Sequence, residues 1–179
     1  MRRAQFLKLA GLTQQAFDLA RARKLLPLRG RVMQAGWQNF TVDDAVAVET
    51  ATSLFRLGMA KSDARDVIDA YFDLAIDWLT AGECTDSVYI GMASIVEVGG
   101  ADIAEEQHWL IGSTKDIEDE IKRLEAALGH NYFVSGERKI DLRFCVAQVL
   151  RRAANAKFED PRLYELAHLF SLAVNGLKT

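Results

Sequence analysis

The first 35 residues concentrate positive charge. They contain eight lysines and arginines but only one acidic residue, Asp18, so this segment has a net charge of +7. Residues 36–179 carry −10, which brings the whole chain to −3. Because lysine and arginine bind phosphate groups, a basic segment on an acidic body can direct one face of a protein toward a polyanion. The eight basic residues are Arg2, Arg3, Lys8, Arg21, Arg23, Lys24, Arg29 and Arg31.

The rest of the chain lacks the residue spacing of a catalytic or metal-binding site. His108 lies near Glu105 and Glu106, but the spacing puts no two of these on one helical face, and the local pattern is strand-like. The two cysteines, Cys84 and Cys145, are far apart in apolar surroundings, so we predict buried free thiols. We therefore expect no enzymatic activity, no metal and no cofactor.

The composition is that of a water-soluble globular protein. Half of the 179 residues are hydrophobic and 26% are charged, which allows a sizeable core and excludes general disorder. The N-terminal residues lack the apolar region and cleavage site of a signal peptide. No apolar stretch reaches the length of about 18 residues that a membrane span needs. We expect a cytoplasmic protein without membrane contact.

Six of the eight basic residues lie on or next to a predicted pair of short helices. Apolar residues between positions 6 and 10 indicate a first helix, which Gly11 ends. Thr13 is a good N-cap, so the segment Leu12–Arg23 reads as the second helix of a helix–turn–helix. This arrangement would present several lysines and arginines on neighbouring elements.

A ribbon and two longer helices are expected next. Residues 29–40 contain two glycines around a short polar and apolar alternation, which suits a two-stranded ribbon. Thr41 with Asp44 resembles a capping box for a helix that stops at Gly58, and Ser62 caps the following one. Helix, helix, ribbon, helix, helix is the order of a winged helix–turn–helix.

The second half mixes strands and helices. Residues 88–98 predict one or two strands, and 108–111 a second short strand. Helices are expected from Thr114, over Asp141–Ala156 and after Asp160-Pro161. The last helix is apolar on all sides, which implies deep burial or a subunit contact.

These elements predict a mainly α fold with short β segments. We expect an N-terminal winged helix–turn–helix domain over residues 1–82, followed by an α+β region over 83–179 that dimerises. A small-molecule effector is compatible with this organisation, because four aromatic residues from position 78 onward could line a pocket, although such residues more often form core. Those residues are Trp78, Tyr89, Trp109 and Tyr132.

Three blocks of the N-terminal part occur in a characteristic order and spacing. They are Gly11-Leu12-Thr13 with KLLP at 24–27, GWQNFT at 36–41 with Asp43-Asp44, and LFRLGM at 54–59 with Ser62 and Ile68. Together they resemble the DNA-binding domain of the MerR family over about residues 5–72. The C-terminal half resembles no family that we recognise.

The resemblance implies a homodimeric, winged helix–turn–helix protein that binds double-stranded DNA and works with RNA polymerase. Its second helix would enter the major groove, where glutamine can bond bidentately to adenine. The residues placed there to contact bases are Gln14, Gln15 and Asp18. Those placed to contact phosphates are Arg2, Arg3, Arg21, Arg23, Lys24, Arg29, Arg31 and Gln38.

The chain departs from the family pattern at three points. Asp18-Leu19-Ala20 stands where the family commonly has Arg-Tyr-Tyr, and a carboxylate there repels phosphate unless it pairs with Arg2 or Arg21 or accepts from cytosine N4. Gln38 replaces the usual arginine of the wing. A single long dimerising helix after the fourth helix is not predicted.

The sequence thus predicts a sequence-specific transcription regulator that acts as a homodimer. Two alternatives stay open. A phage-type DNA packaging or recombination subunit would use the same winged head to mark a site, and its apolar last helix could bind a motor protein. A protein–protein interaction module would have a winged domain that no longer binds DNA, for which Asp18 is the best argument.

Overall fold

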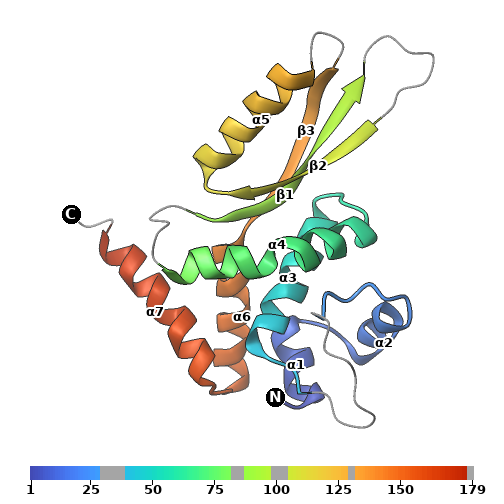
Figure 1. The fold of residues 1–179 in the computed structure, drawn as a ribbon. Helices are drawn as coiled ribbons and strands as arrows, with labels where there is room; N and C mark the ends of the chain where they lie inside the picture. Colours follow the sequence, from blue (N-terminus) through green and yellow to red (C-terminus); the bar gives the residue numbers. More distant parts are fainter. Residues whose placement is uncertain (29–38, 82–86, 98–104, 129–131, 177–179) are drawn as a thin grey trace.

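The computed structural model describes residues 1–28, 39–81, 87–97, 105–128 and 132–176. Within these ranges the protein is mainly helical with one small antiparallel sheet, which confirms the predicted mainly α fold with short β segments (Figure 1). The helices are α1 (Arg3–Ala10), α2 (Gln14–Ala22), α3 (Val42–Arg56), α4 (Lys61–Ala81), α5 (Thr114–Leu128), α6 (Leu142–Ala156) and α7 (Pro161–Gly176). The strands are β1 (Tyr89–Glu97), β2 (Glu105–Gly112) and β3 (Tyr132–Asp141).

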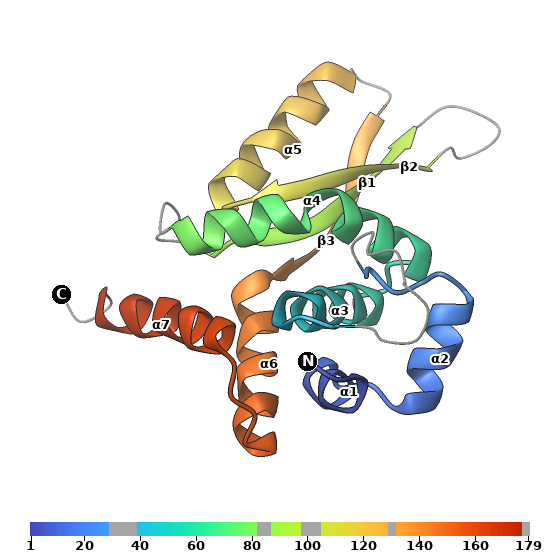
Figure 2. The ribbon, with the colours of Figure 1, turned by 60° about the horizontal axis from the view of Figure 1, so that its bottom comes forward.

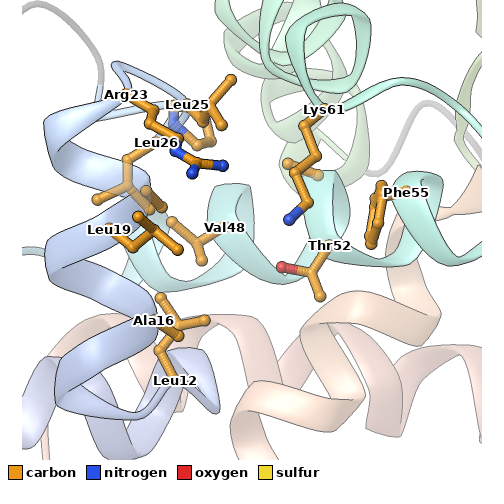
Figure 3. A pocket seen from close by; sticks show the side chains of 13 residues that line it. Leu12, Ala16, Leu19, Arg23, Leu25, Leu26, Val48, Thr52, Phe55 and Lys61 are labelled. Carbon is orange, nitrogen blue, oxygen red and sulfur yellow. The ribbon is translucent and has the colours of Figure 1, made fainter.

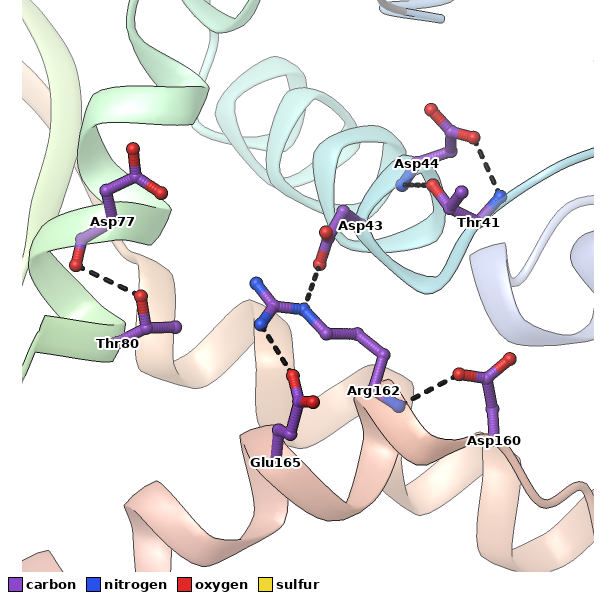
Figure 4. Close-up of polar contacts among 8 residues, drawn as sticks. All are labelled: Thr41, Asp43, Asp44, Asp77, Thr80, Asp160, Arg162 and Glu165. Carbon is purple, nitrogen blue, oxygen red and sulfur yellow. Dashed lines mark hydrogen bonds and ion pairs between the residues drawn. The ribbon is translucent and has the colours of Figure 1, made fainter.

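Short polar side chains start the helices that the sequence predicts. The Thr13 hydroxyl accepts a hydrogen bond from the backbone N–H of Ala16 at 3.1 Å, which caps α2. At the start of α3, the Thr41 hydroxyl accepts from the Asp44 N–H and the Asp44 carboxylate accepts from the Thr41 N–H (Figure 4). Both bonds satisfy backbone donors that have no partner inside a helix.

Glycines end two helices as predicted, whereas one predicted cap is wrong. Gly11 after α1 and Gly58 after α3 have φ of 67° and 91°, in the left-handed region that side chains disfavour. Helix α4 begins at Lys61, so Ser62 lies inside its first turn. The Ser62 hydroxyl donates to the neighbouring Asp63 carboxylate instead of capping the helix.

The sheet has the strand order β2-β1-β3, with both pairs antiparallel. The central β1 places Ile90 opposite Ile111 of β2 and opposite Ile140 of β3. The two strands predicted from the sequence are present, although β2 is longer than expected. The third strand, β3, was not predicted at all; it takes up residues that lie between two predicted helices.

Helices cover both faces of the sheet. Side chains alternate along β1, so Ile90 and Met92 pack into the main core beside α4. Ala93 faces the other way and packs with Leu110 and with Ile117 of α5. Figures 1 and 2 show α5 and α4 on opposite sides of the sheet.

A single large hydrophobic cluster joins the two halves of the described chain. It includes Phe6 of α1, Phe72 of α4, Ile90 of β1, Val149 of α6 and Leu166 of α7. Helix α6 packs directly on α1 and α3 (Figure 1). The C-terminal half therefore packs against α1 and α3 of the N-terminal half. The division into residues 1–82 and 83–179 stays a prediction.

Some predicted features lie outside the described residues. They are nearly all of the ribbon expected over 29–40 and the predicted free thiol of Cys84. Among the helices that the structure describes, none combines the length and apolar character needed to cross a membrane.

Candidate nucleic-acid interface

Helices α1 and α2 are joined by the tight turn Gly11-Leu12-Thr13. The Leu12 N–H donates to the carbonyl of Leu7 at 2.9 Å, and Gly11 adopts the left-handed conformation. A Cβ atom at Gly11 would lie only 2.7 Å from Cζ of Arg152 on α6. The position therefore favours glycine for its backbone angle and for the close approach of this arginine.

A single buried side chain anchors α2. Phe17 is the only buried residue of this helix. Its ring belongs to a cluster of three aromatic rings. The ring of Phe6 stacks on that of Phe40 at 4.2 Å, and Phe17 meets both edge-on at 5.9 and 5.8 Å. Phe40 thus packs in the core. Both ribbon views place α2 at the periphery (Figure 2).

The exposed stripe of α2 carries Gln14, Asp18 and Arg21. Spacings of four and three residues put these side chains on one helical face. The Gln14 amide donates to the Asp18 carboxylate at 2.7 Å, and Arg3 of α1 forms an ion pair with the same carboxylate. The hydrogen bond from Gln14 lowers the pKa of Asp18, with Arg3 and Arg21 adding to the effect.

The partner of Asp18 differs from the two considered from the sequence. Arg3 makes the ion pair, rather than Arg2 or Arg21, and its guanidinium also lies 4.6 Å from the centre of the Phe17 ring. The negative charge of the Asp18 carboxylate is therefore balanced by Arg3 within the protein itself. Gln15 is exposed and its side chain makes no hydrogen bond within the described ranges, so its side-chain amide is available to a ligand.

The basic residues around α2 point in more than one direction. Arg2, Arg21 and Lys24 are exposed. Arg23, also exposed, lines a pocket between α2 and α3 (Figure 3), which sequence reasoning did not foresee. Arg29, Arg31 and Gln38 lie outside the described residues.

The C-terminal end of α2 is tied to the body of the protein. Lys24 follows the helix with a φ of 55°, and its carbonyl accepts a hydrogen bond from Arg65 of α4 at 2.7 Å. At the other end, the turn packs beside Arg152, which donates to the carbonyl of Leu9 at 3.2 Å. Arginines from later parts of the chain therefore hold the backbone on both sides of α2, at Leu9 before the turn and at Lys24 after the helix.

The histidine and cysteine residues considered for catalysis or metal binding make contacts that stabilise the fold. Nε2 of His108 lies 2.8 Å from the Glu120 carboxylate on α5. Among the described residues, no group of three or more His, Cys, Asp or Glu side chains is placed to hold a metal ion. Cys145 is a buried free thiol, as predicted, and burial raises its pKa to about 12.

Comparison with known proteins gives no relative. No protein-family model matches the chain, and searches of curated proteins and of solved structures returned no significant match.

Proposed function

We propose that this protein is a sequence-specific regulator of transcription, of MerR-like type, that binds double-stranded DNA as a homodimer. One observation carries the proposal: α2 is held by one fully buried side chain, Phe17, and exposes the polar residues Gln14, Gln15, Asp18 and Arg21. A helix whose purpose is only to complete a core buries a wider face than this. Such a helix is suited to enter the major groove, which admits one α-helix.

Division of labour within α2 follows from its contacts. Gln15 would read a base edge, because its amide is exposed and unengaged by the described residues. Arg21 and Lys24 would bind phosphates, giving affinity without sequence information. The side chains of Gln14 and Asp18 are hydrogen-bonded to each other. We therefore propose that they mainly fix the shape of the helix surface, and that contact with bases is their secondary role.

The Arg3–Asp18 ion pair bears on the main argument against DNA binding. An isolated carboxylate beside phosphates would repel them, but here a guanidinium accompanies it. Charge also favours one orientation of approach, since residues 1–35 carry +7 and the remainder −10. The acidic body would be repelled by DNA while the basic segment is attracted.

Dimerisation through the C-terminal half is part of the proposal. Three large side chains there are strongly exposed, namely Phe133 (45%), Phe144 (50%) and Tyr164 (62%). Aromatic side chains are enriched in protein interfaces. A two-fold dimer would place two copies of α2 on half-sites about 34–36 Å apart, or a multiple of this.

The direct test is binding to duplex DNA measured by fluorescence anisotropy over a series of salt concentrations. We expect the logarithm of the binding constant to fall linearly with the logarithm of salt concentration. Arg21→Ala should reduce the slope by about one, whereas Lys122→Ala on the distant α5 should leave it unchanged. Absence of binding, or equal effects of both substitutions, would exclude α2 as the DNA-binding element.

The oligomeric state is tested separately by sedimentation. We expect a dimer at the concentrations at which the protein binds DNA, and a monomer there would refute the dimeric part of the proposal.

A further inference from the structure

An apolar pocket of about 260 Å³ lies between α2 and α3. Ala16 and Leu19 of α2 form one wall, and Val48 and Phe55 of α3 form the other (Figure 3). Leu19 and Phe55 remain 51% and 45% exposed, so this apolar surface is only partly covered. Burying it against an apolar molecule would be favourable.

The pocket also has a cationic side. The Lys61 ammonium, from the start of α4, and the Arg23 guanidinium, from the end of α2, both point into the space between the helices (Figure 3). The hydroxyl of Thr52 on α3 faces the same space. None of the described lining residues is acidic, and neither cation forms an ion pair with a carboxylate in the described part of the chain.

We propose that this pocket binds a small amphipathic carboxylate, with its apolar body between α2 and α3 and its carboxylate between Lys61 and Arg23. Two convergent cations beside an apolar cavity match a molecule with one negative end and a hydrocarbon or aromatic body. The volume of about 260 Å³ exceeds that of an apolar cavity of about 150 Å³ that is known to bind benzene, so the body of a small organic acid can be accommodated. Octanoate has a suitable size.

Charge distinguishes this occupant from a partner helix or a neutral lipid. A partner helix needs an extended apolar groove, whereas here the exposed apolar surface is bounded by Lys61 and Arg23. A neutral molecule would give neither cation a carboxylate, and the Lys61 ammonium would keep only its contact with the Phe55 ring, whose centre lies 4.6 Å away. An anion with a short apolar body satisfies both parts of the pocket.

Titration calorimetry with four probes tests the site on the protein alone, without DNA. We expect octanoate to bind, and octylammonium, octanol and acetate to bind at least tenfold more weakly. Lengthening the chain from hexanoate to octanoate should increase affinity by up to about fourfold per methylene group. Equal binding of octanoate and octylammonium, or no binding of octanoate, overturns the proposal.

Substitutions locate the ligand. Lys61→Met keeps the aliphatic stem but removes the charge, and we expect it to weaken octanoate binding about three- to tenfold. Ala16→Leu keeps a strong helix former while filling the cavity, and should abolish binding. Lys122→Met on α5 is the matched control and should bind octanoate normally. Loss of binding in Lys122→Met, or full binding in Ala16→Leu, would show that octanoate binds elsewhere.

A regulatory consequence rests on the proposed function. Because α2 forms one wall of the pocket, a ligand there would alter the position of α2 and so its affinity for DNA, and DNA would alter ligand affinity by the same factor. The two claims fail separately. Octanoate binding without DNA binding refutes the proposed function alone, whereas DNA binding without octanoate binding refutes the pocket alone.

Discussion

Arg152 of α6 donates a hydrogen bond from Nη1 to Oε2 of Glu49 on α3 over 2.6 Å. The Glu49 side chain is only 2% exposed, and the same nitrogen of Arg152 donates to the carbonyl of Leu9 at the end of α1. One guanidinium therefore joins three helices behind the turn of the proposed DNA-binding element. A second arginine, Arg162 of α7, binds Asp43 at the start of α3 at 3.0 Å (Figure 4).

Removing the partner of this buried carboxylate should be costly. Arg152→Met would leave Glu49 buried without its closest cation, and we expect the free energy of unfolding to fall by about 3–5 kcal/mol. Urea denaturation measures the effect. Arg151→Met is the control, because Arg151 is exposed and donates to Gln148 instead. Equal losses in the two variants would show that the buried pair has no special role.

A side chain at Gly11 should lower the free energy of unfolding. Gly11→Ala would place a Cβ against Arg152 and force a left-handed conformation on alanine, which costs about 1–2 kcal/mol before any displacement of the arginine. Thermal unfolding should show a lower midpoint for this variant. Gly136→Ala on β3, where a Cβ would meet nothing within 4 Å, should change stability by no more than about 0.5 kcal/mol. A neutral Gly11→Ala would contradict the described turn.

Base reading should depend on Gln15. We expect Gln15→Ala to weaken binding to the preferred site by about 1–3 kcal/mol more than binding to random duplex, if its amide bonds bidentately to a base. Anisotropy with a selected and a randomised duplex measures both affinities. Equal losses on the two DNAs would remove Gln15 from base recognition.

Asp18 should restrain non-specific affinity. Asp18→Asn removes a carboxylate that occupies Arg3, so the released guanidinium would gain a phosphate contact. Binding to random duplex should tighten, and the slope against salt should steepen by about 0.9. Asp119→Asn on α5 should leave both unchanged. Weaker binding by Asp18→Asn would instead assign the carboxylate a direct contact with a base.

Protonation of Glu120 on α5 at low pH should lower the free energy of unfolding, because this carboxylate binds His108 of β2. Hydrogen bonds from Arg123 and His108 lower the pKa of Glu120 from 4.5 to about 2. Because the folded state favours the ionised carboxylate, its stabilisation is complete above pH 4.5 and is lost as pH falls toward 2. The stability difference between wild type and Glu120→Gln should therefore shrink between pH 6 and pH 2.5. A difference that is constant with pH would refute this.

Local signals in the sequence predicted the helix boundaries well. Helix caps depend on neighbours only a few residues away, so the local sequence is enough to predict them. The correctly predicted ones are at Thr13, at Thr41 with Asp44, at Gly11 and at Gly58. Ser62 failed because a serine also tolerates the first turn of a helix, where it lies.

Features that depend on distant partners were missed. Strand β3 contains Gly136 and the charged run 137–139, which look like a loop until β1 supplies its hydrogen bonds. The Glu49–Arg152 pair spans 103 positions, and the pocket at Lys61 needs three separate elements. The Arg3–Asp18 contact likewise depends on how the turn orients α1 against α2.

Helix α2 is the element that we propose to contact DNA. The most direct measurement is an NMR titration of the isotope-labelled protein with duplex DNA, following each backbone amide. We expect the largest shift changes over Gln14–Ala22 and none over α5, Thr114–Leu128. Changes centred on α5, or no changes at all, would contradict the account.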